Sequence, residues 1–295
     1  MKGGMDAAAG PLVRARHDLD RGRPDRALAA LARVTGPELE SEEFWRLRAH
    51  ALYESRDWKA AAAAAREGLD RDPGDFELLD LLALAQLESG RKKDARATID
   101  GALLVYPDSA VLHAHRALIL ARSAKKSFRL ASYRKARAAV DEALRLDPES
   151  EPVLRVRAQI AAMSRDPRAA QYSAELLELD PEDEHSHVIA GMALARRGQT
   201  STGLRHFSEA ARLDPADSRM AHLGRRSRVL QGRFAAPLLF ADRLTRGHFR
   251  LAWFVFAFVT IRLHQPLLTI LVIAFWAYGW AAHIYIRLRV GKAPK

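Results

Sequence analysis

The chain contains no cysteine among its 295 residues. This absence excludes disulfide bonds and thiolate metal sites, and it is typical of a protein from a reducing compartment. The first residues, Met1 to Met5, are not followed by an apolar stretch. The start of the chain therefore does not resemble a secretory signal.

The sequence also lacks the motifs of common catalytic sites. No phosphate loop, GxGxxG, GxSxG or HExxH pattern occurs in it. His113 and His115, like His185 and His187, stand two residues apart. On a helix this spacing turns the two rings toward different faces, which makes each pair a poor metal site. We therefore expect no enzyme activity, no catalytic or metal-binding residue and no cofactor.

Acidic residues are fewer than basic ones. The chain carries 36 Asp and Glu against 47 Lys and Arg, a formal net charge of +11 at pH 7. Such an excess favours an anionic partner, which is membrane lipid, nucleic acid or an acidic protein. Long apolar runs are absent from residues 1–233, which are rich in Ala and Arg, and the chain becomes apolar and aromatic from Phe234 onward.

Prolines recur at nearly constant spacing, with one longer step in the middle, and each has a small residue twelve positions upstream. A fixed period of about 34 residues indicates stacked helical repeats, which usually form binding surfaces. The prolines are Pro73, Pro107, Pro148, Pro181 and Pro215, and the small residues are Ala61, Ala95, Ala136, Ala169 and Gly203. The longer step is the one from Pro107 to Pro148.

Each repeat reads as helix, turn and helix. Gly22, Gly90 and Gly198 fall where a helix must end in a left-handed residue. Asp-Pro steps separate the repeats, because proline does not fit inside a helix, and the Asp or Ser just after each proline is suited to cap the next helix.

The residues at fixed positions of the repeat resemble the tetratricopeptide repeat (TPR) family. In the second repeat the family's large residue at position 4, its small residues at 8, 20 and 27 and its proline at 32 correspond to Trp45, Ala49, Ala61, Gly68 and Pro73. The resemblance covers roughly residues 8–217, although the first repeat lacks the proline and the fourth has about seven extra residues. It implies an all-α, right-handed solenoid of about six helix-turn-helix units.

The apolar carboxy-terminal region predicts a transmembrane helical hairpin. Residues 266–286 carry no formal charge over 21 positions, which is enough to cross a hydrocarbon core of about 30 Å. Residues 248–263 form a shorter first span, and basic residues flank the pair on both sides, which favours a cytoplasmic location for both termini. The flanking residues expected to face anionic lipid are Arg243, Arg246, Arg250, Arg287 and Arg289.

The predicted organisation has seven segments. They are a disordered start (1–7), the TPR-like solenoid (8–217), a capping helix (218–232), a basic juxtamembrane linker (233–247), two transmembrane helices (248–263 and 266–286) and a basic cytoplasmic tail (287–295). The high Arg and Ala content resembles that of GC-rich bacterial proteins, so we expect a location in a bacterial inner membrane.

Two clusters are candidates for binding a partner. The TPR resemblance implies a concave groove lined by the first helix of each repeat, where a protein or peptide ligand binds. The groove residues that it implies are Arg46, His50, Tyr53, Asp80, Leu84, Leu87, Leu118, Arg155, Gln159 and Met192. The long fourth repeat supplies the second cluster, a basic insertion of Arg122, Lys125, Lys126, Arg129, Arg134, Lys135 and Arg137.

These features predict a membrane-anchored scaffold that recruits a peptide or protein partner to the cytoplasmic face of the membrane. Two other functions stay open. The basic insertion is compatible with a nucleic-acid-associated protein, in which the cations contact phosphates. The hairpin is also compatible with a membrane-shaping protein whose solenoid oligomerises.

Overall fold

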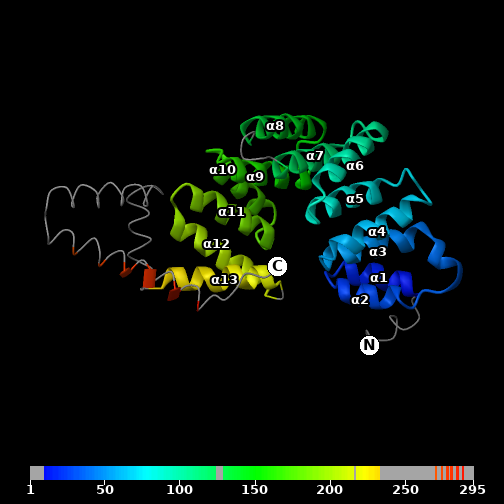
Figure 1. Ribbon diagram of the computed structural model, residues 1–295, viewed down its shortest axis with the longest axis horizontal. Helices are drawn as coiled ribbons and strands as arrows, with labels where there is room; N and C mark the ends of the chain where they lie inside the picture. The colour runs from blue at the N-terminus through cyan, green and yellow to red at the C-terminus, as the bar shows by residue number, and fades with distance from the viewer. Residues whose placement is uncertain are drawn as a thin grey trace. The chain divides into compact units, whose positions relative to one another are not determined.

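The computed structural model describes residues 10–123, 129–215 and 217–232. It also describes isolated positions between 270 and 288, each of which is helical. These parts of the chain form α-helices and one 3₁₀ segment and contain no strand, as the sequence predicts (Figure 1).

The helices follow one another in antiparallel pairs. The first six are α1 (Pro11–Leu19), α2 (Pro24–Leu31), α3 (Glu42–Glu54), α4 (Trp58–Leu69), α5 (Phe76–Glu88) and α6 (Lys92–Val105), with the 3₁₀ segment η1 (Gly36–Glu40) between α2 and α3. The others are α7 (Ala110–Arg122), α8 (Arg129–Leu146), α9 (Glu151–Ser164), α10 (Ala169–Leu179), α11 (Glu184–Arg196), α12 (Thr200–Leu213) and α13 (Ser218–Gln231).

Contacts between residues divide the chain into two compact units. The amino-terminal unit is Met1–Val156 and the carboxy-terminal unit is Arg157–Lys295, so that the division falls inside α9. Helices α1 to α8 thus belong to the first unit, and α10 to α13 belong to the second.

Asp and Ser side chains begin the first helices of the repeats. In each case the side-chain oxygen accepts a hydrogen bond from a backbone N–H of the first turn, which satisfies a group that has no partner within the helix. Asp75, Ser109, Asp183 and Asp217 confirm the capping predicted after the repeat prolines, and Ser41 caps α3 in the same way without such a proline.

Left-handed residues join the two helices of several repeats. Gly22, Gly90 and Gly198 have φ of 64°, 84° and 79°, which confirms the predicted glycine turns. Arg56 and Arg165 adopt the same conformation with φ of 63° and 61°. Side chains other than glycine are disfavoured there, because the β-carbon crowds the backbone.

Small residues bring the helices of the amino-terminal unit close together. Alanines from α3, α4 and α5 are buried around Leu78, which is fully enclosed. A β-carbon on Gly68 of α4 would lie 2.4 Å from Leu78 Cδ1 and 3.0 Å from Trp45 Cβ. A larger residue at this crossing of α4 would therefore displace the enclosed Leu78 side chain.

Glycines have the same role in the carboxy-terminal unit. Gly191 of α11 faces Gly203 of α12, and a β-carbon on Gly203 would lie 2.7 Å from the Gly191 carbonyl oxygen. Further along, a β-carbon on Gly224 of α13 would lie 2.4 Å from Ala211 Cβ of α12. Backbone therefore packs against backbone between α11 and α12, and α13 packs closely on the small Ala211 side chain of α12.

Several predicted segments lie outside the described residues. These are the start (1–7), the linker (233–247), the first transmembrane helix (248–263), the tail (287–295, apart from position 288) and most of the second transmembrane helix (266–286). Within the described part of the chain, no helix combines the length and the apolar character needed to cross a membrane.

Candidate functional site

The first helices of the repeats form one layer in the amino-terminal unit. α1 contacts α3, α3 contacts α5 and α5 contacts α7, whereas the second helices α4 and α6 contact their own partners and the following first helix. Closer spacing of one row of helices places that row on the inner side of a solenoid. We call the exposed surface of α3, α5 and α7 the first-helix face.

Strict repetition of the period aligns the first-helix face. α3, α5 and α7 begin at Glu42, Phe76 and Ala110, and each has 13 residues. Side chains one period apart therefore occupy equivalent places along the row. His50, Leu84 and Leu118 form one such set, and Glu54, Glu88 and Arg122 form another.

Five predicted groove residues of this unit reach the surface of the row. On α3, His50 is exposed, and Arg46 and Tyr53 are half-buried. On α5, Leu84 and Asp80 are half-buried. Together they present apolar, aromatic and charged groups over neighbouring helices, as a groove for a peptide would.

Two predicted groove residues are buried, and these expectations were wrong. Leu87 is 2% exposed and Leu118 is 8% exposed, so neither presents a surface to a partner. α5 contacts the four helices α3, α4, α6 and α7, and α7 contacts α5, α6 and α8. Side chains at the equivalent positions of the repeat are therefore exposed or half-buried on α3, whereas Leu87 and Leu118 are covered by neighbouring helices on α5 and α7.

Ion pairs link the helices across the first-helix face. Nδ1 of His115 on α7 lies 2.6 Å from the Asp80 carboxylate on α5, and both side chains are largely buried. Nε of Arg46 lies 3.0 Å from the carboxylate of Asp75, the capping residue of α5. The cationic groups of the face are thus largely compensated by acids, and the face offers hydrogen-bonding groups more than net charge.

The strongest of these pairs corrects the prediction for Arg122. We expected Arg122 in the basic insertion, but it is the last residue of α7 and its guanidinium binds the Glu88 carboxylate of α5 through both terminal nitrogens. The hydrogen bond to Glu88 raises the pKa of Arg122 further above its usual value. The pair ties two neighbouring repeats together at the carboxyl ends of their first helices.

Tyr53 lies beside this pair. Burial raises the pKa of its phenol, and the negative charges of Glu88 and Glu54 raise it further. The ring also packs edge-on against Trp58, with centroids 4.9 Å apart. The phenol therefore stays protonated throughout the physiological range, which keeps its O–H available as a donor.

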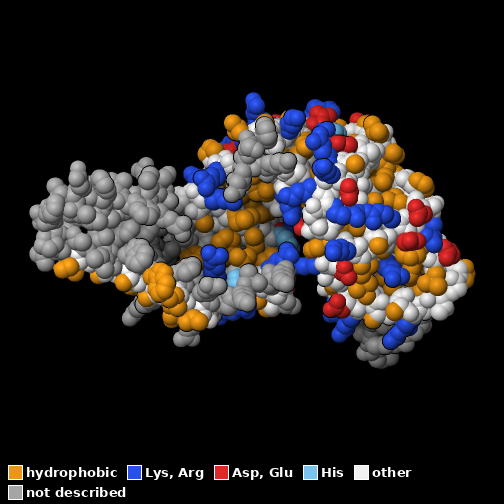
Figure 2. Space-filling view, in the orientation of Figure 1, with side chains coloured by type: hydrophobic (Ala, Val, Ile, Leu, Met, Phe, Trp, Pro, Cys, Tyr) orange, Lys and Arg blue, Asp and Glu red, His pale blue; other side chains and the backbone are white. Residues whose placement is uncertain are grey.

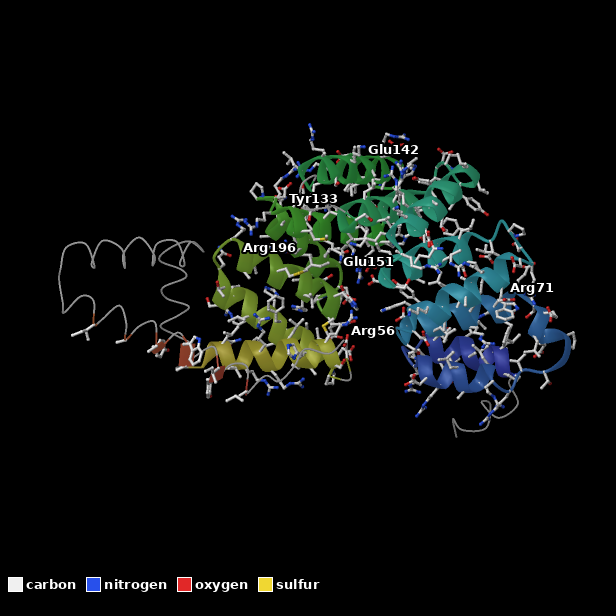
Figure 3. All side chains as sticks on the ribbon, viewed as in Figure 1. Arg56, Arg71, Tyr133, Glu142, Glu151 and Arg196 are labelled. Atoms are coloured by element: carbon white, nitrogen blue, oxygen red, sulfur yellow. The ribbon has the colours of Figure 1, made fainter. Side chains whose placement is uncertain are left out.

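The remainder of the basic insertion lies mainly on α8. Arg134, Lys135 and Arg137 are exposed on this helix, to which Tyr133 also belongs (Figure 3). Lys125 and Lys126 lie outside the described residues, as does the side chain of Arg129. Figure 2 shows Lys and Arg side chains interspersed with Asp and Glu on the visible face of the amino-terminal unit.

The other predicted site residues lie on helices α9 and α11 or outside the described residues. Arg155 of α9 is half-buried and forms an ion pair with Glu151, one turn earlier. Gln159 of α9 and Met192 of α11 belong to the carboxy-terminal unit and are half-buried. The lipid-facing residues Arg243, Arg246, Arg250, Arg287 and Arg289 lie outside the described residues.

Sequence reasoning missed a histidine pair in the carboxy-terminal unit. Nδ1 of His187 on α11 lies 3.0 Å from Nδ1 of His206 on α12. Nε2 of His187 lies 3.0 Å from the Pro181 carbonyl oxygen, just as Nε2 of His113 lies 2.9 Å from that of Pro107. The repeated Pro-x5-His spacing could have indicated these two carbonyl contacts, but it does not indicate the contact with His206.

Asp183, Glu184 and His185 hold three potential metal-ligand atoms within 4.8 Å of one another, in the portion of the chain that the structure describes. Asp183 already accepts the backbone N–H of Ser186 as the capping residue of α11, and acids are favoured at a helix start by the helix dipole. The cluster is explained by these local roles.

Two stretches of the chain match models of the tetratricopeptide repeat. The matched residues are 12–76 and 52–119. No curated protein sequence matches the chain.

Solved structures show the same fold at low sequence identity. A TPR protein of Thermus thermophilus, TTC0263, is 18% identical with a TM-score of 0.58, and the match covers 64% of this chain and 100% of that one. Human IFIT1 in complex with PPP-AAAA is 16% identical with a TM-score of 0.56, and the match covers 88% of this chain and 66% of that one. Residues 12–119 of this chain thus match tetratricopeptide repeats, and the described residues share the all-α fold of these structures.

Proposed function

We propose that this chain is an adaptor that binds a peptide or protein segment on the first-helix face of its amino-terminal unit. Tetratricopeptide repeats serve as protein-interaction scaffolds. The observation that carries the proposal is the continuous row of α3, α5 and α7, on which His50 is exposed and Tyr53 and Leu84 are half-buried between inter-repeat ion pairs.

The chemistry of this face suits a segment of mixed character. Leu84 offers an apolar contact in the middle of the row, and Tyr53 and His50 offer hydrogen-bonding groups on the neighbouring helix. Because Arg46, His115 and Arg122 are paired with acids, net attraction for acidic peptides is weak on this side. Selectivity would come from shape and hydrogen bonds.

The first test is crosslinking of the full-length chain in cells that express it, followed by identification of the attached proteins. Leu84→Glu places a charge at the centre of the face and should remove the specific partners. His50→Glu should weaken their capture and carries less risk to folding, because His50 is exposed. Leu104→Glu is the matched control, since Leu104 is 85% exposed on the second helix α6. Equal capture by the wild type and both face variants would refute the proposal.

The proposed site of action is the cytoplasmic face of an inner membrane, reached by a hairpin of residues 248–263 and 266–286. The uncharged stretch at 266–286 supports this assignment. Every described position between 270 and 288 is helical and carries an apolar or aromatic residue, with Ile270, Trp280 and Leu288 61%, 65% and 79% exposed. Exposed apolar side chains at these positions favour an apolar environment, and anionic lipid would bind the basic residues on either side of 248–286.

Membrane attachment is tested separately from partner binding. Alkaline carbonate extraction should leave the chain in the membrane pellet, and a reporter fused after Lys295 should be cytoplasmic. An extracytoplasmic reporter would contradict the hairpin, and release by carbonate would contradict any transmembrane segment.

A further inference from the structure

A pocket of about 380 Å³ lies on the amino-terminal unit, away from the first-helix face. It is formed by side chains of α6, α7 and α8, which belong to the third repeat and to the long fourth repeat. Its size falls in the range of pockets that bind small ligands or single side chains of a partner.

α7 contributes opposite sides to the two surfaces. His113, Arg116 and Leu120 recur at helical spacing and line the pocket. His115 and Arg122 are offset from that stripe and instead bind acids of α5 on the first-helix face. One helix thus serves two separate surfaces, so that changes to one can leave the other intact.

The ion pairs around the pocket leave acids in short supply. Arg96 of α6 and Arg116 of α7 share the Asp100 carboxylate, at 3.4 Å and 2.7 Å, so one acid serves two guanidinium groups. Glu142 of α8 also lines the pocket, but it is bound by Arg145 at 2.7 Å (Figure 3). Each of these two carboxylates is therefore already occupied.

Lys135 contributes a positive charge to the pocket that no ion pair neutralises among the described residues. It lines the pocket from α8, it is exposed, and it has no ionic partner among the described residues. An acid placed between Lys135 and Arg96 would reduce this excess of positive charge, and such complementarity directs association with anionic partners.

The apolar part of the pocket wall is aliphatic. Leu120 and Ala139 are almost fully buried behind it, and Ala138 is exposed at its side. Among the described residues that line it, none is Phe, Tyr or Trp. Single-stranded nucleic acids are usually held by stacking on aromatic rings, so this lining favours an aliphatic group.

We propose that this pocket binds an acidic peptide segment of a partner protein, which inserts an aliphatic side chain against Leu120 and Ala139 and places a carboxylate between Arg96 and Lys135. This is a second docking site, on the second-helix side of the chain, and it gives the basic residue Lys135 of the long repeat a function. It does not depend on occupation of the first-helix face.

The test is a fluorescence anisotropy titration of the full-length chain in detergent with the labelled peptide EELEELEEL. Lys135→Glu should weaken binding roughly tenfold, because it removes one attraction and adds one repulsion. Ala138→Phe fills the pocket without changing charge and should weaken binding to a similar extent. Arg134→Glu is the matched control, since it makes the same charge change on α8 but does not line the pocket.

The outcomes separate the alternatives. Weak binding of EESEESEES, which lacks the aliphatic groups, together with unchanged binding by Arg134→Glu and Leu84→Glu, would support the pocket and keep it distinct from the first-helix face. Equal losses for Arg134→Glu and Lys135→Glu would show attraction by net charge alone and overturn the proposal. Preferential, Lys135-dependent binding of a labelled twelve-nucleotide oligo(A) RNA would overturn it in favour of nucleic acid.

Discussion

Left-handed residues set the turn within several repeats, and their energetics are local. Gly90 has φ of 84°, and a β-carbon there meets nothing within 4 Å, so the cost of any other residue comes from the backbone alone. Gly101, in contrast, lies inside α6 with the same open surroundings. Because neither position is crowded, the two positions separate left-handed backbone strain from helix propensity.

Gly90→Ala should lower the free energy of unfolding by about 1 kcal/mol, because alanine is strained in the left-handed region. Gly101→Ala should raise it by up to about 1 kcal/mol, because alanine favours the helix. Urea denaturation followed by circular dichroism measures both. A shift of the same sign in the two variants would contradict this account.

The His187–His206 pair predicts a response to acid. Burial lowers the pKa of His206, and the neighbouring His187 and Arg205 lower it further, from an ordinary value of 6.5. The unfolded chain therefore binds a proton more readily than the folded one as pH falls through 6.5. Stability of the carboxy-terminal unit should be constant above this pH and should decrease below it.

Thermal unfolding at pH 7.5 and pH 5.5 tests this prediction. The unfolding temperature of the wild type should be lower at pH 5.5 than at pH 7.5. The difference should be smaller for His206→Gln, because glutamine cannot gain a proton. His50 is an exposed histidine of α3, and His50→Gln should show the same change in unfolding temperature with pH as the wild type. The same fall in all three proteins would exclude the pair as the cause.

Some of these residues could be predicted from sequence and others could not. A glycine at a regular place in a repeat indicates a left-handed turn, and Gly22, Gly90 and Gly198 confirm it. Arg56 adopts the same conformation without any sign of it in its residue type. The His187–His206 contact joins two helices through side chains, and sequence spacing along one helix does not report it.

Pairs of helices are held at distances that only glycine permits. In the α11–α12 pair, a β-carbon on Gly203 would lie 2.7 Å from the Gly191 carbonyl oxygen and 3.1 Å from the Ala195 backbone nitrogen. Both neighbours are backbone atoms, which do not rotate away as a side chain would. The helices themselves would have to separate.

Gly203→Ala should therefore destabilise the chain by about 1–3 kcal/mol, the usual effect of overpacking, despite the better helix propensity of alanine. Chemical denaturation measures the change, with Gly101→Ala as the control for propensity. Equal stability of the two variants would mean that the α11–α12 crossing tolerates a wider spacing.

The arrangement of the helices was predictable, but the exposed sides of the inner first helices were not. Proline spacing and small residues define helix pairs, because each depends on local rules. α5 carries apolar residues on several sides, including Leu78, Leu84 and Leu87, and its sequence does not distinguish the open side from the packed ones. Burial of Leu87 and Leu118 depends on which neighbours cover them.

At the scale of the whole molecule, stability is expected to be distributed. The contacts form two compact units, and within each unit helices contact their near neighbours along the chain. In such repeat proteins a local defect changes the repeats beside it far more than distant ones. The described parts of the two units should therefore respond separately to substitutions.

Hydrogen exchange measured by mass spectrometry tests this expectation. Gly203→Ala should increase exchange in α11, α12 and α13, whereas α3 to α6 should keep the protection of the wild type. Gly68→Ala, at the crossing with Leu78 and Trp45, should increase exchange in α3 to α6 and leave α11, α12 and α13 as protected as in the wild type. A uniform increase over the whole chain in either variant would indicate a single cooperative unit.

The identical lengths of α3, α5 and α7, and their starts one repeat period apart, also bear on how the gene can change. Loss or duplication of one whole repeat would rejoin the flanking helices in phase, with the capping residue, the turn and the ion-pair positions still aligned. An insertion of any other length within one of these helices would rotate the rest of that helix out of phase. Relatives of this chain should therefore differ in length within residues 42–109 by whole repeats.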